Sequence, residues 1–168
     1  MIVSLGVSLN CRLVVSPTHM NPQAEFGPPD LKIAGFQLWV HGWAHPDDSN
    51  VWDRNWLSVT AHCGSYGASI RVQGSLLMVS DVADFGDQCA AMHRNNSGSA
   101  VLDPFEPELK VLLETADLVG HIRARVEITP DHMTQSHRME FDLDQSYLPD
   151  IIKQCSAILQ EYPVRRIP

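Results

Sequence analysis

Apolar residues occupy every second position from Leu57 to Cys63, with polar residues between them. This alternation is the period of a strand with one buried face. The chain is expected to turn at residues 64–67, and the alternation resumes from Ala68 to Val72. The two stretches therefore predict a central hairpin with both apolar rows on one face, in which Ala61 pairs with Ile70 and Val59 with Val72.

Strand patterns also lie on both sides of this hairpin. Leu31–Val40 has strand composition, although its alternation slips at Gly35, which indicates a bulge. His41–Asn50 contains Gly, Pro, Asp, Ser and Asn and is expected to be a loop. Downstream, a short strand is predicted at 100–102 and longer alternating strands at 108–114, 119–129 and 136–144.

Helical spacing appears twice. Ser80 is a good N-cap, and Asp81 and Asp84 follow in the first turn, where acidic residues are favoured. The apolar face of this helix consists of Val82, Phe85, Cys89 and Met92. A second amphipathic helix is predicted from Pro149 to Glu161, and Pro163 stops it.

The charged faces of the last three strands predict their register. When 119–129 and 136–144 pair with their apolar residues on one face, opposite charges also align. The expected neighbours are Glu127 and Arg138, Arg125 and Glu140, Arg123 and Asp142, and His121 and Asp144. Strand 108–114 then places Glu114 beside Arg123 and Lys110 beside Glu127. Carboxylates held in such an exposed ladder make poor catalytic acids.

These elements predict an α+β fold: a curved antiparallel β-sheet of about six to seven strands, with two helices packed on its apolar face. We expect a single domain over 23–168 and a poorly ordered lead segment over 1–22. That segment is apolar, but it has no Lys or Arg directly after Met1, and Arg12 interrupts the apolar stretch. Both features argue against a signal peptide. No apolar stretch approaches the ~20 residues that span a bilayer.

Composition narrows the class of partner. The 168 residues are 44% hydrophobic and 19% charged, as in a packed globular protein, and the net charge is −8. An acidic surface disfavours nucleic acid and anionic membranes and suits a basic partner, although acidity also serves solubility alone. The four cysteines form no Cys-x-x-Cys pair, and we interpret them as reduced core residues of a cytoplasmic protein.

Known catalytic patterns are absent from the sequence. There is no Gly-x-Ser-x-Gly elbow and no phosphate-binding glycine loop. His41 and His45 lie in a loop, and His132 and His137 flank a turn beside Asp131, so a zinc site lacks a closed ligand set. We therefore predict no catalytic residue, no metal and no cofactor.

Aromatic and acidic residues gather in two predicted loops. Four tryptophans (Trp39, Trp43, Trp52 and Trp56) either cap the sheet edge or anchor a partner. Six carboxylates stay outside the ladder and either are solvated loop acids or form a patch that captures a basic partner. The candidate partner-binding residues are Trp43, Asp47, Asp48, Trp52, Asp53, Asp103, Glu106 and Glu108.

Two motifs carry a family resemblance. Residues 52–59, read as Trp-Asp-Arg-Asn-Trp-Leu-Ser-Val, are similar to the W-D-x-N-W-L-x-V signature of WapI-type immunity proteins. These are small bacterial proteins encoded beside wall-associated or Rhs-like polymorphic toxins. Residues 106–111 resemble the family's second landmark, Glu-Pro-x-Leu before a strand. The resemblance covers about residues 29–162.

The resemblance implies a protein that binds a cognate toxin domain, often a nuclease, and blocks its active site. It transfers no catalytic residue, and Trp52, Asn55 and Trp56 carry over only as fold landmarks. We expect a basic toxin as the partner, no nucleic acid or membrane, and a monomer or weak dimer. Two alternatives stay open: a small enzyme or ligand-binding domain that uses loop 41–53, and an interaction module without a toxin partner.

Overall fold

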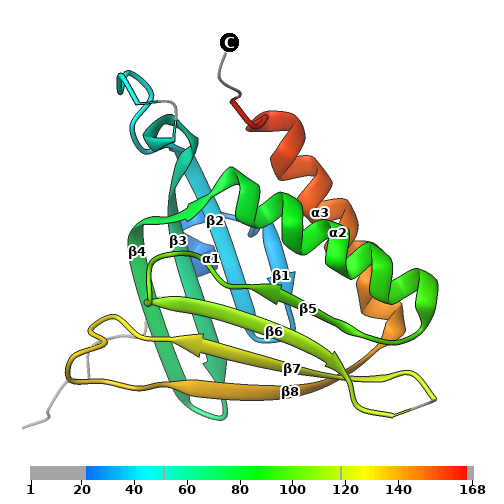
Figure 1. The fold of residues 1–168 in the computed structure, drawn as a ribbon. Coiled ribbons are helices and arrows are strands. Elements are labelled where there is room, and N and C mark those ends of the chain that lie inside the picture. Colours follow the sequence, from blue (N-terminus) through cyan, green and yellow to red (C-terminus); the bar gives the residue numbers. More distant parts are fainter. Residues whose placement is uncertain (1–21, 51, 118, 166–168) are drawn as a thin grey trace, which may run out of the picture.

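The computed structural model describes residues 22–50, 52–117 and 119–165, which form two antiparallel sheets and two long helices (Figure 1). The first sheet contains β1 (Leu31–Ile33), β2 (Phe36–Trp43), β3 (Trp56–Ser65) and β4 (Ala68–Met78). The second contains β5 (Ser99–Leu102), β6 (Leu109–Thr115), β7 (His121–Ile128) and β8 (Arg138–Asp144). The helical elements are α1 (Pro22–Phe26), η1 (Asp53–Asn55), α2 (Val79–Asn95), η2 (Gln145–Tyr147) and α3 (Leu148–Glu161).

The α+β class is confirmed, but the prediction of one curved sheet is wrong. The strand orders are β1-β2-β3-β4 and β5-β6-β7-β8, with no pairing between the two sheets. The helix α2 follows β4 directly and leads to β5, so the chain leaves the first sheet before the second begins. Figure 1 shows the second set of strands running across the first. Period-two patterns reveal which strands have a buried face, but not which strands pair.

The hydrophobic core lies between the sheets and the two long helices. The strands β3 and β4 contact β7 and β8 on one side, whereas α3 contacts β1 and α2 contacts β5 on the other. The helices α2 and α3 pack side by side there (Figure 1). The two sheets thus meet along one side, and the helices fill the space between them on the other.

The predicted charge ladder of the second sheet is confirmed residue by residue. All four expected pairs between β7 and β8 are direct neighbours, from Glu127 and Arg138 to His121 and Asp144. Lys110 and Glu114 of β6 likewise lie opposite Glu127 and Arg123. A shift of one residue between two strands would turn every apolar side chain of the shifted strand toward the solvent. The burial of one face therefore determines the register.

The central hairpin is present, but its predicted register is wrong by two residues. Ala61 pairs with Val72 and Cys63 with Ile70, because the turn consists of Tyr66 and Gly67 alone. Both turn residues have positive φ, 46° and 87°, as a two-residue hairpin turn of type I′ requires. The shift is an even number of residues, so the apolar side chains keep their face.

The first predicted strand is in fact two strands. Gly35 lies in the turn between β1 and β2, where Ile33 pairs with Phe36, rather than at a bulge. A Cβ on Gly35 would lie 2.2 Å from the carbonyl oxygen of Gly64 and 2.8 Å from the ring of Phe141 on β8. Glycine is therefore required at this turn, because the backbone of β3 in the same sheet and Phe141 of the second sheet both approach it. The irregularity within β2 falls between Val40 and Gly42, and the strand continues to Trp43 into the predicted loop.

Two edge strands are closed by glutamine side chains from the helices. The Gln88 side chain of α2 accepts a hydrogen bond from the N–H of Val101 on β5 (2.9 Å). The Gln154 side chain of α3 accepts one from the N–H of Lys32 on β1 (2.6 Å). An exposed strand edge is a template for unwanted pairing, so these contacts protect the edges beside the helices.

Most of the expectation for residues 1–22 lies outside the described residues, as does Cys11; Pro22 begins α1. Among the described residues, no helix is both long and apolar enough to cross a membrane.

Candidate partner-binding surface

The loop between β2 and β3, residues 44–55, is closed at its base by a backbone hydrogen bond from Ala44 N–H to the carbonyl of Trp56 (2.8 Å). At its tip, the Asp48 carboxylate accepts from Asn50 N–H (2.8 Å), and the Asn50 side chain accepts from Trp52 N–H (3.0 Å). Short polar side chains that bond to the backbone two residues on are typical of turns. Asp47 and Asp48 are exposed on this tip, and Asp53 is half-buried in η1.

The four tryptophans divide between the two predicted roles. Trp39 is buried and Trp56 is half-buried. Trp43 is half-buried as well, because the Arg165 guanidinium lies over its ring at 3.9 Å and the ring of Tyr162 meets it edge-on at 5.6 Å. Trp52 is 66% exposed. Trp52 is thus the tryptophan most available to a partner, whereas Trp43 is engaged within the chain.

Asn55, which the sequence identifies as a fold landmark, connects the loop to the C-terminal segment. It is only 6% exposed. Its side-chain N–H donates to the carbonyl of Arg165 (3.0 Å), and its side-chain oxygen accepts from Arg165 N–H (2.8 Å). Asn55 therefore makes the backbone-directed bonds that suit its type, but to a residue 110 positions away.

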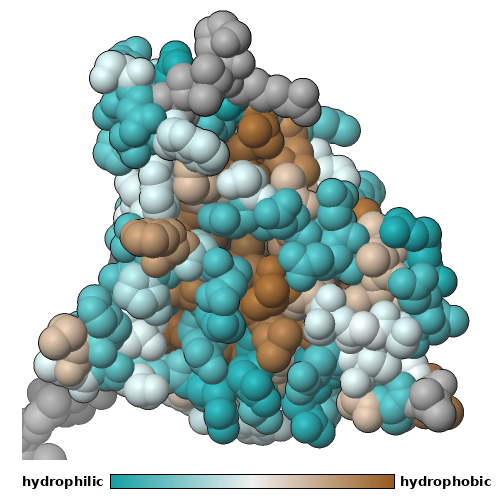
Figure 2. Space-filling model, viewed as in Figure 1, coloured by the Kyte–Doolittle hydropathy of each residue, from teal (hydrophilic) through white to brown (hydrophobic). Residues whose placement is uncertain are grey.

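The loop between β5 and β6, residues 103–108, is acidic and carries an exposed aromatic side chain. Phe105 is 89% exposed. Figure 2 shows an isolated hydrophobic patch on the left, where Figure 1 draws this loop. Two of its carboxylates, which were expected to stay outside the strand ladder, have partners: Asp103 binds Lys110 (2.7 Å) and Glu108 lies 3.7 Å from His132. Glu106 is half-buried.

The first turns of α2 lie between the two loops. Trp56, next to η1, pairs with Met78, which immediately precedes α2. On the other side, a hollow of about 160 Å³ is lined by Asp81, Asp84, Gln88, Val101 and Asp103. The two loops and this helix end therefore adjoin on one side of the molecule (Figure 1). We refer to this region as the acidic band; its carboxylates are Asp47, Asp48, Asp53, Asp81, Asp84, Asp103 and Glu106.

Within the acidic band, Asp81 also has a structural task. Its carboxylate accepts a hydrogen bond from Met78 N–H (2.7 Å). Met78 is the N-cap of α2, so the N-cap lies two residues before the predicted position, Ser80. Burial raises the pKa of Asp81 above its usual value, the nearby Asp84 adds to this, and the Met78 hydrogen bond opposes it. From the sequence, Asp81 and Asp84 were expected only as acidic residues of the first helical turn, and Phe105 had no predicted role. Only the juxtaposition of α2 with both loops connects them to a surface.

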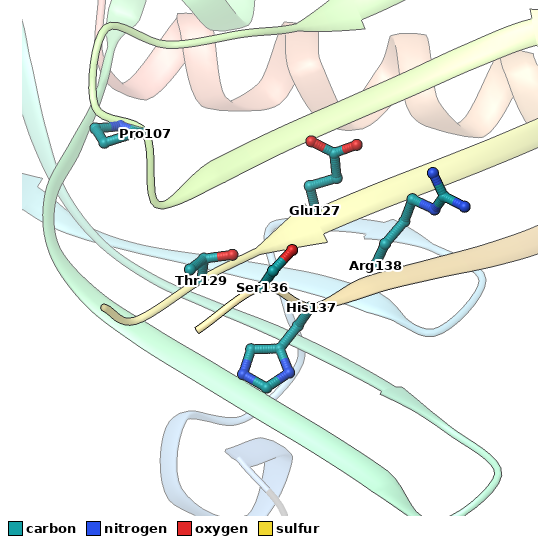
Figure 3. Close-up of a pocket in the computed structure, with 6 residues that line it drawn as sticks. All are labelled: Pro107, Glu127, Thr129, Ser136, His137 and Arg138. Carbon is teal, nitrogen blue, oxygen red and sulfur yellow. The ribbon is translucent and has the colours of Figure 1, made fainter. Parts of the chain in front are cut away.

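Another hollow, of about 240 Å³, lies beside the end of the β7–β8 hairpin and has the residue types of a hydrolase site. Its lining includes Glu127, Ser136 and His137 (Figure 3). However, Figure 3 shows the His137 imidazole pointing away from the Ser136 hydroxyl and from Glu127. The ring instead makes a 3.1 Å hydrogen bond with Gln135. A base that activates a nucleophile must lie within hydrogen-bond reach of it, so this geometry offers no serine chemistry.

The histidines considered as zinc ligands from the sequence, among them His41, His132 and His137, have other partners in the structure. His41 bonds to the Thr60 hydroxyl on the outer face of the first sheet (2.8 Å). His132 lies near Glu108 and His137 near Gln135. In the part of the chain that the structure describes, no three His, Cys, Asp or Glu side chains are placed to hold a metal ion.

Cys63, Cys89 and Cys155 are free, buried thiols. Burial raises the pKa of each of them to about 12. A thiol with such a pKa carries almost no thiolate at neutral pH and is a poor nucleophile. The interpretation of these three cysteines as core residues is therefore confirmed.

Comparison with known proteins places this arrangement in a family. The chain matches the Immunity protein WapI-like family over residues 30–163, which is most of its length. It therefore belongs to this family of immunity proteins, as the motifs at 52–59 and 106–111 predicted. Neither the curated proteins nor the solved structures contain a match to the chain.

Proposed function

We propose that this protein neutralises a cognate toxin domain by binding it and covering its active site, without chemistry of its own. The observation that carries the proposal is the family match over residues 30–163. Two observations described above support a binding role: the His137 imidazole points away from Ser136 and Glu127, and burial raises the pKa of the three buried thiols to about 12. Free buried thiols suit a reducing compartment, so we place this activity in the cytoplasm.

The proposed toxin is a basic nuclease. A nuclease domain needs a positively charged surface for the phosphate backbone of its substrate. A chain with a net charge of −8 can occupy such a surface in place of nucleic acid. Charge complementarity of this kind speeds association and selects partners more than it adds affinity.

The acidic band is the proposed contact surface. It contains the exposed Asp47 and Asp48, the half-buried Asp53 and Glu106, and the aromatic side chains Trp52 and Phe105. Exposed aromatic side chains are frequent energetic centres of interfaces, and Trp is the most enriched of them. Trp43 is excluded from this revised set, because Arg165 and Tyr162 cover it.

Co-expression tests the function. Toxin domains encoded next to this chain would be expressed with and without it in a sensitive bacterial host. Protection from one of them, together with a stable one-to-one complex on size-exclusion chromatography, is the expected result. Full killing despite abundant folded immunity protein would remove the proposal.

Charge reversal tests the surface. Asp47→Lys with Glu106→Lys should slow association with the toxin at low salt by about tenfold or more, because long-range attraction is lost. A matched control, Asp142→Lys with Asp150→Lys on β8 and α3, changes net charge by the same amount. Equal slowing in both variants would show that net charge alone matters and would clear the two loops.

Truncation of the aromatic side chains tests the centre of the interface. Trp52→Ala and Phe105→Ala should each increase the dissociation rate, by a factor corresponding to about 2 kcal/mol if the side chain is a hot spot. Tyr66→Ala is the control, since Tyr66 is fully exposed in the turn between β3 and β4. Dissociation that changes in none of the three variants would place the interface elsewhere.

A further inference from the structure

Arg165 contacts the loop 44–55 at two residues, Asn55 and Pro46, and also contacts Trp43, the residue before the loop. Its backbone forms the two hydrogen bonds with the Asn55 side chain near the end of the loop. Its guanidinium lies over the ring of Trp43, just before the loop begins. The same guanidinium donates to the carbonyl of Pro46 at 3.2 Å. Arg165, which follows α3 in the chain, thus connects both ends of a loop that lies more than a hundred positions earlier.

The side chain of Asn55 acts here as a peptide group would in a strand ladder. It donates to the carbonyl and accepts from the N–H of a single residue, Arg165. Asn55 is buried and Arg165 is half-buried, so loss of these bonds would remove the side-chain partner of the Arg165 N–H and carbonyl groups. Asn carries both a donor and an acceptor, whereas Asp or Leu of similar size would lose one or both.

The contacts of the Arg165 side chain suit a planar cation. A guanidinium can stack face to face on an indole while it donates a hydrogen bond in its own plane, whereas an ammonium group has no planar face to stack. Tyr162 contacts the edge of the same Trp43 ring, so the aromatic group is enclosed from two directions. The C-terminal segment therefore packs against Trp43 through Arg165 and Tyr162.

At the tip of the loop, the hydrogen bonds that the Asp48 and Asn50 side chains accept each span two residues, and residues 45–50 are exposed. We propose that Arg165 and Asn55 form a clamp that holds this loop in the shape that the toxin recognises, which makes both of them positioning residues. The inference rests on the proposed function for the identity of the partner, but the clamp itself is a property of this chain.

Hydrogen exchange measured by mass spectrometry tests the clamp in the full-length protein. Asn55→Ala removes the two backbone bonds, and Arg165→Ala removes the ring and Pro46 contacts. Each should increase amide exchange in the loop by about tenfold or more, while exchange in β6 and β7 stays unchanged. Trypsin should also cut faster after Arg54, whose side chain is half-buried in η1. Arg94→Ala, at an exposed position in the last turn of α2, is the control.

Binding to the toxin identified by co-expression separates this inference from the proposed function. A loosened loop should weaken affinity by about tenfold, because the ordering must then occur on binding. Arg165→Lys, which keeps the charge but not the planar group, should resemble Arg165→Ala rather than the wild type.

The outcomes are distinct. Unchanged exchange in Asn55→Ala and Arg165→Ala would refute the clamp whatever the protein binds. A faster-exchanging loop with unchanged toxin affinity would refute its positioning role, while the immunity function would stand. Loss of affinity together with faster exchange throughout β6 and β7 would indicate global destabilisation and would also count against it. Failure of the wild-type protein to bind or protect would instead remove the proposed function.

Discussion

The outer face of the second sheet and the loop between β2 and β3 are held in opposite ways. On the sheet, charged side chains face one another in pairs that follow from strand register, and they remain exposed to solvent. In the loop, the buried Asn55 amide binds Arg165, 110 positions away, and the guanidinium of Arg165 lies over the ring of Trp43. The sheet repeats many weak contacts, whereas the loop relies on a few that cannot be replaced. We therefore expect single substitutions to be tolerated on the first and costly in the second.

The largest loss of stability is expected from a substitution of Gly35, whose close contacts with Gly64 and Phe141 leave no room for a side chain. Gly35→Ala would bring a Cβ to 2.2 Å from the Gly64 carbonyl oxygen and 2.8 Å from Phe141. Because backbone must move to relieve this, we expect a loss of at least about 3 kcal/mol in the free energy of unfolding. Gly74→Ala is the matched control, since its nearest neighbour is a Leu76 methyl at 3.6 Å, an ordinary contact. Urea unfolding measures both; equal stability of the two variants would contradict the close approach.

Asn55→Ala should follow in size. Truncation of this buried side chain removes the partner of the N–H and C=O groups of the half-buried Arg165. We expect the free energy of unfolding to fall by about 1–3 kcal/mol. Asn95→Ala, near the exposed end of α2, gives the comparison for a surface asparagine. If both variants unfold at the same urea concentration, the amide of Asn55 contributes nothing beyond a surface residue.

A ladder substitution should have a much smaller effect. Arg125 donates to Glu140 at 3.1 Å and holds the pKa of Glu140 below its ordinary value of 4.5, chiefly through that hydrogen bond. A lowered carboxyl pKa stabilises the fold above the ordinary value, and this contribution is lost as pH falls through the folded pKa. The unfolding midpoint of Arg125→Ala should therefore lie only slightly below that of the wild type at neutral pH. The difference should shrink with salt and vanish in acid; a shift as large as that of Asn55→Ala would contradict the comparison.

The smallest expected effects are opposite titrations of two histidines. The pKa of His121 lies above 6.5, because Asp117 forms a hydrogen bond with its ring. The pKa of His62 lies below 6.5, because it is partly buried and then because Arg71 lies nearby. His121 therefore favours the fold below pH 6.5 and loses this effect as pH rises through its folded pKa. His62 acts in the other direction and disfavours the fold as pH falls below 6.5.

NMR titration of the ring protons measures both pKa values directly. Asp117→Asn should return His121 toward 6.5 and leave His62 unchanged. A shared pKa for the two histidines would show that neither environment acts as described.

The sequence predicted the local features of the fold well. Both long helices, the strands of the second sheet and all their charge pairs follow from periods of 3.6 and 2.0 residues. The strand boundaries and register of the first sheet were harder to predict. Its two-residue turns, Ala34–Gly35 and Tyr66–Gly67, each begin with a residue type that rarely adopts a positive φ. Ala34 and Tyr66 adopt φ of 50° and 46°, an uncommon conformation for residues with side chains.

The candidate surface was found only in part. Acidic residues between strands indicated both loops, and Trp52 stood out by its residue type. The sequence did not show that Lys110 neutralises Asp103, that Trp43 is covered, or that α2 joins the loops. Each of these depends on contacts between elements that are distant in the chain.

By itself, the amino-acid sequence determined the elements, the register of the second sheet and the membership in an immunity protein family, because these depend on periodicity and on short motifs. Only the tertiary structure decided that the strands form two crossed sheets, that Gly35 lies where they meet and that Arg165 binds the loop through Asn55. The reason is physical. A side-chain pattern records which face of a segment avoids water, but it carries no information about which distant segment will cover that face.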